Sequence, residues 1–269
     1  MGSVFLYHHN SSVCAAKVRI ALSEKNVPWD GEMMQLNGDQ FEPDYLKLNP
    51  KAVVPTLVHN GSAITESNII LEYLDDAFPA PPLRPSDPVE VAMMRHWLMR
   101  LDSGSDGIHH DISVITYAAA FRHQLIKDCG GNDRKTLDEA VKNNMNKNSR
   151  AWLREVVFEG TNAAAFEQAV LRFDRLAEDV EQTLAVQEWL VGSRYSLADV
   201  AYTPYFTRVE LLQFDALFAN RPRLCSWFEQ LKSRASYSEV IDRYLPKTIE
   251  TLNVHGGEVA DKVAEIVST

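Results

Sequence analysis

The chain has 269 residues, enough for one or two domains with sizeable cores, and 45% of its residues are hydrophobic. Its formal net charge of −10 argues against nucleic-acid binding, because there is no basic stripe to neutralise phosphates. No run of about 18 apolar residues is present and the N-terminus lacks a signal-peptide core, so neither a membrane span nor secretion is expected. Three widely spaced cysteines without a CxxC pair favour a reducing, cytoplasmic location.

The first 79 residues predict alternating strands and helices. Strands are expected over residues 3–7, 29–36, 53–59 and 62–65, and helices over residues 12–25 and 41–48 and from Glu66 onward. In the first helix, Lys17 and Arg19 fall off the apolar face. Asn60-Gly61 indicates a two-residue type I′ hairpin between the last two strands. The order is βαβα followed by ββα, which predicts an α/β domain over residues 1–79.

Prolines mark the end of this domain. Five of them lie between Pro79 and Pro88, which predicts a stiff linker over residues 80–88 because proline suits neither a helix interior nor a central strand. Beyond the linker, an all-α domain is expected over residues 89–246. Its helices are predicted over residues 89–121 (bent near residues 103–105), 166–184, 195–214 and 223–234. An insertion over about residues 122–160 contains a polar run, 127–150, that is expected to be irregular, and the tail 247–269 is weakly patterned.

Pro55 follows Val54 inside a β-branched run. Because proline cannot donate to a sheet ladder, this position must lie at a strand start, an edge or a bend. One interpretation is an ordinary trans proline at a sheet edge. The other is a cis-proline that exposes the backbone N–H and C=O of Val54 to an extended peptide ligand. The βαβ-ββα order favours the cis-proline.

Thr65-Glu66-Ser67 stands where a strand gives way to a helix. These residues are suited to helix capping alone. They also suit a ligand with an α-amino-acid end, since a helix N-terminus with the Ser67 hydroxyl binds a carboxylate and Glu66 accepts from an ammonium.

Ser12 and Cys14 lie at the start of the first helix. The positive end of a helix dipole stabilises a thiolate, whether that of Cys14 or that of a ligand, and Lys17 and Arg19 are near in sequence. Alternatively, Cys14 is a small buried hydrophobic residue. The spacing leaves open whether Ser12 or Cys14 is the key catalytic residue.

Together these features resemble the cytosolic glutathione transferase superfamily over about residues 3–245. The resemblance is specific in LYHHNSSVCAAKVRIAL, NPKAVVPTLVHNG and ITESNIILEYLDDAFP. WLVGSRYSLADVAYTP is similar to the family's buried capping box, here Ser196 and Asp199, whose role is structural. The resemblance implies a thioredoxin-like glutathione-binding domain, a helical substrate-binding domain, and a cytoplasmic homodimer without a metal.

The resemblance also implies glutathione as co-substrate and gives its ligands. Val54 and Pro55 would hold the cysteinyl part in a strand-like pairing. Glu66 and Ser67 would hold the γ-glutamyl end, and Lys51 is a candidate for the glycyl carboxylate.

The Ser12-x-Cys14 pattern before a Lys-Val-Arg helix is similar to zeta-class maleylacetoacetate isomerases, and closer to bacterial reductive dehalogenases of chlorinated hydroquinones. The linker LRPSDP and the long insertion also resemble the β-etherases, which do not carry this cysteine at the matching place. The likeness implies thiolate attack on a hydrophobic, aromatic electrophile in aromatic catabolism or detoxification. Cys14 would support dehalogenation or glutathione removal, and Ser12 would support aryl-ether cleavage or cis–trans isomerisation. The intact site favours an enzyme over a non-catalytic glutathione-binding protein of the same fold.

The electrophile is expected in a cleft between the domains. Candidate lining residues are His8, His9, Asn10, His109, Ile112 and Tyr117. His109 and His110 are poor candidates for metal ligands, because adjacent histidines on a helix point apart and no Cys or carboxylate cluster accompanies them. The aromatic residues of the helical domain suit an aromatic substrate or a plain core. They are Tyr117, Phe121, Trp152, Tyr202, Tyr205 and Phe206.

Overall fold

The computed structural model describes residues 3–36, 38–102, 107–131, 133–142 and 150–268, and the chain divides into two compact units. Unit 1 comprises Met1–Leu98, Gln187–Tyr205 and Ser226–Pro246. Unit 2 comprises Met99–Val186, Phe206–Cys225 and Lys247–Thr269. Three stretches of the predicted helical domain, residues 89–98, 187–205 and 226–246, therefore belong to the same unit as the sheet.

The sheet of unit 1 has four strands in the order β2-β1-β3-β4. They are β1 (Val4–His8), β2 (Asp30–Met33), β3 (Thr56–His59) and β4 (Ser62–Ile64). β1 runs parallel to β2 and antiparallel to β3, and Leu6 pairs with Leu57, both fully buried. Asn60 and Gly61 both have positive φ, 51° and 77°, which confirms the predicted type I′ turn between β3 and β4.

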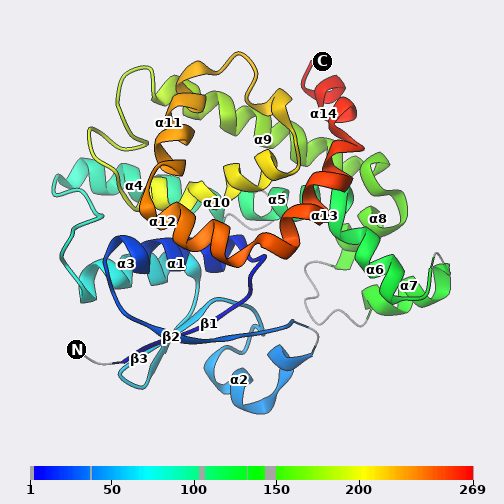
Figure 1. Ribbon diagram of the computed structural model, residues 1–269, viewed down its shortest axis with the longest axis horizontal. Coiled ribbons are helices and arrows are strands. Elements are labelled where there is room, and N and C mark those ends of the chain that lie inside the picture. Colours follow the sequence, from blue (N-terminus) through cyan, green and yellow to red (C-terminus); the bar gives the residue numbers. More distant parts are fainter. Residues whose placement is uncertain (1–2, 37, 103–106, 132, 143–149, 269) are drawn as a thin grey trace. The chain divides into compact units, whose positions relative to one another are not determined.

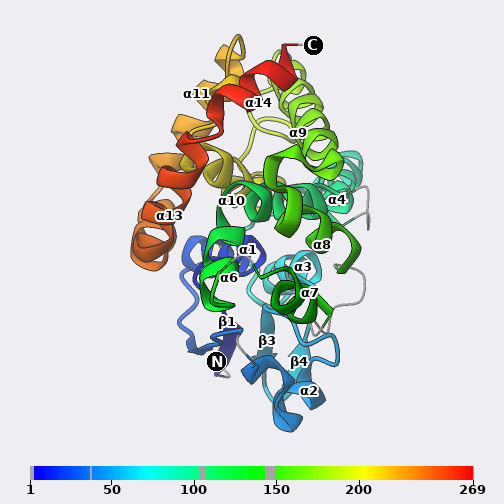
Figure 2. The same cartoon turned by 90° about the vertical axis from the view of Figure 1, so that its right-hand side faces the viewer.

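Helices cover both faces of this sheet. α1 (Val13–Glu24) and α3 (Ser67–Ala77) lie side by side on one face, and the short α2 (Pro43–Leu48), after a 3₁₀ turn η1 (Asp39–Phe41), lies on the other (Figures 1 and 2). This is the predicted βαβα-ββα order. The expectation that Lys17 and Arg19 lie off the buried face of α1 is wrong, because both are buried. The segment formed by α12 (Ala235–Tyr237) and a π-helical turn η6 (Ser238–Asp242) also packs against α1 and covers it.

The linker is anchored by buried charge. α3 ends at Ala77 and α4 (Pro88–Leu101) begins at Pro88, so the proline-rich segment forms neither helix nor strand. Asp75 accepts hydrogen bonds from Lys25 Nζ at 2.6 Å and from the Leu83 N–H at 2.8 Å. Lys25 also donates to the Pro81 carbonyl at 2.9 Å. The stiff linker is therefore held to the C-terminal end of α1.

The predicted capping box opens α10 (Leu197–Leu211), and α11 (Pro222–Lys232) follows it. Asp199 accepts from the Ser196 N–H at 2.9 Å, from Trp227 Nε1 at 2.9 Å and from the Leu190 N–H at 3.0 Å. Burial raises the pKa of Asp199, whereas these hydrogen bonds lower it because they stabilise the charged form. The effect of burial is the larger, so the pKa is raised. The box is buried, and its structural role is confirmed.

Unit 2 is helical in the residues that the structure describes. Its elements are α5 (Ile108–Thr116), a π-helical turn η3 (Tyr117–Phe121), α6 (Arg122–Asp128), α7 (Arg134–Lys142), α8 (Arg150–Glu159), the 3₁₀ turn η4 (Gly160–Asn162), α9 (Ala164–Thr183), the 3₁₀ turn η5 (Asp215–Leu217), α13 (Pro246–Gly257) and α14 (Ala260–Val267). α5 packs along α9, where Arg172 donates to the fully buried Asp111 through Nε at 2.9 Å.

One expectation for this unit needs correction. The polar run 127–150 is not irregular throughout, because α7 forms within it and buries Leu137 and Val141, four residues apart, against α8. Residues 143–149 and the expected bend at residues 103–105 lie outside the described residues. The tail 247–269, which is weakly patterned in the sequence, is largely helical. It forms α13 and α14, with Leu252 and Val263 fully buried.

Among the residues described, no helix has both the length and the apolar character that crossing a membrane requires.

Candidate functional site

The start of α1 combines a hydroxyl and a thiol. Ser12 is the N-cap, and its Oγ accepts a hydrogen bond from the Ala15 N–H at 3.1 Å. Because Oγ acts there as an acceptor, its own proton is left for donation to a ligand. Cys14 lies in the first turn, half-buried, with its Sγ 3.9 Å from the hydroxyl of Tyr205. Both side chains therefore stand at the positive end of the helix dipole.

The loop between β1 and α1 is clamped by Arg19. Its Nη1 donates to His8 Nδ1 at 3.1 Å and to the His9 carbonyl at 3.2 Å, and its Nη2 donates to the Asn10 carbonyl at 3.3 Å. His9 Nδ1 in turn accepts from the Ser11 N–H at 3.3 Å and lies 2.9 Å from Ser11 Oγ. A backbone N–H can only donate, so the proton of a neutral His9 is on Nε2. These contacts hold in place the backbone of residues 9–11, which leads into Ser12.

Two buried cations lie along the same part of α1. Lys17, fully buried, donates to Asn68 Oδ1 at 2.8 Å, and its Nζ is 5.6 Å from the ring centroid of Tyr205. Arg19, 1% exposed, lies 4.4 Å from the ring centroid of Tyr244. These partners are neutral groups, so they leave the positive charge uncancelled.

The pKa values of Arg19 and His8 leave the positive charge of this pair on Arg19. Burial lowers the pKa of Arg19 to about 10, so its guanidinium remains protonated at neutral pH. Burial, together with the charge of Arg19, lowers the pKa of His8 to about 4. His8 is therefore neutral and accepts from Arg19. The resulting field at the start of α1 favours an anion such as a thiolate.

The Val54–Pro55 peptide bond is cis, which confirms the cis-proline prediction. The loop before it is pinned from two sides: the Val53 carbonyl accepts from Tyr45 Oη at 2.6 Å and from Asn49 Nδ2 at 2.9 Å. Within the described part of the chain, no hydrogen bond engages the N–H or the C=O of Val54. Backbone groups of this kind are suited to pairing with an extended peptide.

The start of α3 gathers three further candidates. Glu66 is the N-cap residue with φ 65°, a conformation that costs a non-glycine residue about 1–3 kcal/mol and is concentrated at functional sites. Its carboxylate pairs with Lys51 Nζ at 2.6 Å, and both side chains are exposed. Ser67 follows at the first helical position, largely buried. The Lys17–Asn68 hydrogen bond joins α1 to this first turn of α3.

The predicted substrate-lining residues fall into both units. In unit 1, His8 packs in the core against the rings of Trp29 and Tyr244, which leaves little of it for a ligand. In unit 2, Ile112 is buried and His109 is exposed on α5. Tyr117 opens the π-helical turn η3 and meets Phe121 and Trp152 edge to face, at centroid distances of 5.6 and 5.7 Å. Their substrate roles stay predictions, although π-helical turns are frequent at functional sites.

From the sequence, Tyr205 suits either an aromatic substrate or the core. The structure places its hydroxyl beside Cys14 and its ring beside Lys17. Cys14 and Tyr205 are 191 positions apart, and nothing in either segment signals the contact. Asn68, the partner of Lys17, was missed although it directly follows Glu66-Ser67.

Family comparisons agree with this fold. The model of the glutathione S-transferase N-terminal domain matches residues 11–77, and that of the glutathione S-transferase C-terminal domain matches residues 119–235. The chain therefore belongs to the glutathione S-transferase family, whose fold of a small sheet domain and a helical domain is the one predicted. By this membership it is a glutathione transferase-type enzyme.

Three relatives resemble the chain over most of its length. Tetrachloro-p-hydroquinone reductive dehalogenase of Sphingobium chlorophenolicum is 29% identical over 244 residues, covering 88% of this chain and 95% of that protein. LigF of Sphingobium sp. SYK-6 is 29% identical over 255 residues, 88% of this chain and 93% of LigF. The crystal structure of that beta-etherase superposes with a TM-score of 0.74 at 26% identity, covering 90% of this chain and 99% of LigF. A probable maleylacetoacetate isomerase of Vibrio cholerae is 26% identical over 251 residues, which cover 91% of this chain and 99% of that protein.

Proposed function

We propose that this enzyme uses glutathione to displace a leaving group from a hydrophobic aromatic electrophile, and that Cys14 then removes the glutathionyl group reductively. The observation that carries the proposal is the environment of Cys14. Its thiol is only half-buried, lies in the first turn of α1, and has the Tyr205 hydroxyl 3.9 Å from its sulfur. An inert structural cysteine would be buried in apolar surroundings, whereas this one is suited to thiol–disulfide exchange.

Glutathione is bound, in this proposal, by groups of unit 1. The N–H and C=O of Val54, next to Pro55, pair with the cysteinyl residue. Ser67 and the N-terminus of α3 take the γ-glutamyl carboxylate, and Glu66 takes the ammonium. Lys51 takes the glycyl carboxylate. When glutathione binds, the ion pair between Lys51 and Glu66 breaks, and each side chain pairs with a charged group of glutathione instead. Such an exposed pair contributes only about 0–1 kcal/mol, so the exchange costs little.

The first chemical step is attack by the glutathione thiolate. Ser12 donates its hydroxyl proton in a hydrogen bond to the sulfur, and the α1 dipole with Lys17 and Arg19 lowers the pKa of the bound thiol. The thiolate attacks the ring carbon, a carbon–sulfur bond forms, and the halide leaves with the electron pair of the broken bond. Holding the two reactants together supplies up to about 7–11 kcal/mol in well-oriented cases.

The second step uses Cys14. Its thiolate attacks the glutathionyl sulfur, the carbon–sulfur bond breaks, and the electron pair goes to the aromatic carbon, which takes up a proton. A second glutathione thiolate attacks the mixed disulfide on Cys14, giving glutathione disulfide and restoring the Cys14 thiolate. In balance, two glutathiones are oxidised to one disulfide, the aryl halide becomes the arene, and halide and a proton are released.

A second candidate is β-aryl ether cleavage, favoured by the LigF likeness along almost the whole of that chain. Here the glutathione thiolate attacks the aliphatic β-carbon of the ether instead of a ring carbon. A carbon–sulfur bond forms there, and the aryloxide leaves with the electron pair of the broken carbon–oxygen bond. The thioether is the product, so Ser12 is required and Cys14 is not.

Glutathione-dependent chloride release from a chlorinated hydroquinone separates the two candidates. We expect the intact enzyme to release chloride and form the reduced ring, and Cys14→Ala to stop at the glutathionyl conjugate. Ser12→Ala is expected to slow conjugate formation itself. Cys225→Ala, which removes another half-buried thiol, is the matched control and should behave as the intact enzyme. Absence of chloride release, with cleavage of a β-aryl ether that survives Cys14→Ala, would replace the first candidate by the second.

We also propose that the enzyme acts as a cytoplasmic homodimer. None of its three cysteines forms a disulfide, which suits a reducing compartment. Light scattering coupled to gel filtration tests the assembly, and a mass near the 30.4 kDa of one chain would contradict it.

A further inference from the structure

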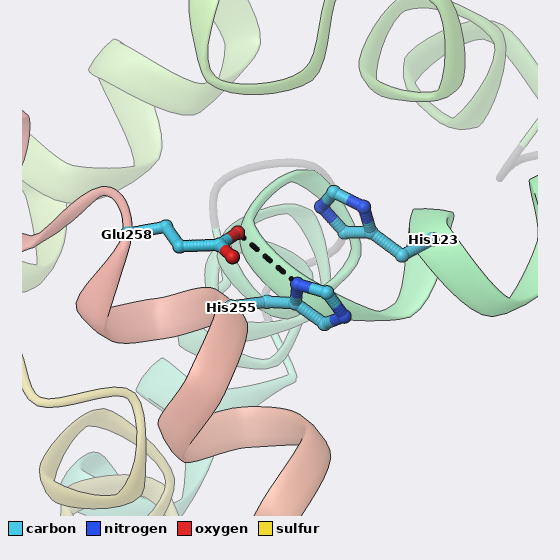
Figure 3. A group of neighbouring side chains, drawn as sticks. All are labelled: His123, His255 and Glu258. Atoms are coloured by element: carbon cyan, nitrogen blue, oxygen red, sulfur yellow. Dashed lines mark hydrogen bonds and ion pairs between the residues drawn. The ribbon is translucent and has the colours of Figure 1, made fainter.

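Two histidines and a glutamate converge in unit 2 where α6 meets α13 (Figure 3). His123 belongs to α6, His255 to the last turn of α13, and Glu258 to the turn that follows. The nitrogen and oxygen atoms that they can offer all lie within 4.8 Å of one another. The two imidazole rings are stacked, with centroids 3.9 Å apart and planes inclined by 5°. His255 Nδ1 lies 3.1 Å from Glu258 Oε2.

This donor set is typical of one class of metal ion. Imidazole nitrogens with a carboxylate oxygen suit zinc and other divalent first-row transition metals, whereas magnesium and calcium prefer oxygen ligands throughout. At bond lengths of about 2.0–2.2 Å, tetrahedral ligand atoms are about 3.4 Å apart. The present spread exceeds that by at most about 1.4 Å. Because the lone pair of an imidazole nitrogen lies in the ring plane, binding also requires the stacked rings to turn apart, and side-chain rotation provides both movements. Glu258 is exposed and both histidines are only half-buried, so these rotations are open to them.

We propose that His123, His255 and Glu258 form a binding site for a divalent transition-metal ion of the zinc class, with water completing the coordination. One nearby cation is Arg122, whose guanidinium donates to the Val157 carbonyl through Nη2 at 3.0 Å and through Nε at 3.3 Å. The Glu258 carboxylate offsets this charge at the site.

The consequence of such a site is a link between distant parts of the chain. His123 and His255 are 132 positions apart (255 − 123) and come from α6 and α13. An ion bound by both would fasten the C-terminal helices to α6 and stabilise unit 2 by mass action. The family resemblance implied no metal. Only His255 and Glu258 are close in sequence, so nothing local signals the approach of His123. The site shares no residue with the proposed glutathione site, so the two proposals fail independently.

The test is titration of the purified full-length chain with zinc chloride in a calorimeter. We expect one equivalent to bind, and His123→Ala, His255→Ala and Glu258→Gln each to weaken the affinity more than about tenfold, since loss of even an outer-shell partner costs about 10–100-fold. The matched control is His96→Ala, an exposed histidine of α4, whose affinity should equal that of the intact protein. Circular dichroism of each variant shows whether it is folded.

Cobalt(II) identifies the ligands by a second readout. Nitrogen and oxygen ligands give visible d–d bands without the intense thiolate-to-cobalt charge-transfer band, and zinc should raise the thermal midpoint of the intact protein and of His96→Ala but not of His255→Ala. The proposal is overturned by a thiolate band at one equivalent, by equal zinc affinity in the intact protein and in His123→Ala and His255→Ala, or by no stoichiometric binding at all.

Discussion

The buried charges at the two ends of α1 have different kinds of partner, neutral groups at one end and oppositely charged groups at the other. Near the N-terminal end, the described contacts of Lys17 and Arg19 are with an amide, an imidazole, backbone carbonyls and aromatic rings. At the C-terminal end, Lys25 is paired with Asp75 at 2.6 Å, and Glu24 accepts from Arg234 Nε and Nη2 at 2.6 and 2.7 Å. One end keeps its positive charge and the other is neutralised by carboxylates.

This contrast separates chemistry from stability along one helix. A buried cation without a counter-ion lowers the stability of the fold. Its electric field contributes to chemistry only where an anion, such as a thiolate, forms nearby. A cavity of about 510 Å³ lies at the neutralised end, lined in part by Ser23, Glu24, Arg234 and Glu239. There Glu24 bonds Arg234 and Ser23 donates to Glu239, so the lining groups satisfy one another. The reactive end of α1 is therefore the end at Ser12 and Cys14.

The largest expected effect is on stability at the neutralised end. Asp75→Ala leaves Lys25 buried without its carboxylate and removes the acceptor of the Leu83 N–H, so the free energy of unfolding should fall by about 3–5 kcal/mol. Urea denaturation measures it. Asp76→Ala is the control: its carboxylate is 60% exposed and pairs with Arg84, so less than about 1 kcal/mol should be lost. Equal losses in the two variants would refute the assignment of stability to this end.

At the reactive end, Lys17→Met should change chemistry rather than stability. Removing the cation is expected to raise the pKa of the enzyme-bound glutathione thiol by about one unit, equivalent to about 1.4 kcal/mol. The free energy of unfolding should change less than in Asp75→Ala, because the loss of the hydrogen bond to Asn68 is offset by the removal of a charge from the interior. Thiolate absorbance against pH measures the pKa, with the exposed Lys47→Met as control. An unchanged thiol pKa would show that Lys17 has no part in the field.

Ser12 has two roles that substitutions separate. Ser12→Ala removes the N-cap acceptor and should lower the free energy of unfolding by about 1 kcal/mol. Ser12→Asp restores an acceptor for the Ala15 N–H and should therefore restore the stability. The aspartate carboxylate cannot donate a hydrogen bond to the glutathione thiolate, and its negative charge repels the thiolate. Glutathione turnover should therefore be impaired in both variants. Full activity in Ser12→Asp would leave Ser12 with a capping role only.

His8 gives an effect that is confined to acid pH and is absent at neutral pH. Its pKa is lowered from 6.5 to about 4 in the folded protein, so between these values the unfolded chain binds a proton that the folded chain does not. The stabilisation from neutral His8 is complete above pH 6.5 and is lost as the pH falls toward 4. In His8→Gln this part of the acid decline in urea midpoint should disappear, whereas the exposed His96→Gln should retain it. Parallel profiles for both variants would contradict the account.

Local signals made much of unit 1 predictable. Asn60-Gly61 determined the hairpin, and Ser196 with Asp199 determined the cap, because each acts through its own backbone neighbours. The cis bond before Pro55 was predictable from the order of elements around it. The burial of Lys17 and Arg19 was not, since their partners Asn68 and Tyr244 come from distant segments.

Unit 2 was harder for the same reason. α7 has a polar composition and is recognisable only by Leu137 and Val141 on one side, which pack on α8. α13 depends on a close approach in which Gly256 lies against the backbone of Leu212, with no room for a side chain. The Cys14–Tyr205 contact likewise needs the fold of unit 1. The short-range sequence pattern thus predicted the helices and strands, whereas the surroundings of the reactive groups depend on packing between segments that are far apart in the sequence.

The most direct test of the central claim is the covalent state of Cys14 during turnover. The enzyme is mixed with a chlorinated hydroquinone and limiting glutathione, quenched in acid, and analysed by intact mass and peptide mapping. The account predicts a glutathionyl group on the peptide carrying Cys14, removed by excess glutathione and absent in Cys14→Ala. Undiminished reduction of the ring by Cys14→Ala, with no adduct on the intact enzyme, would contradict it.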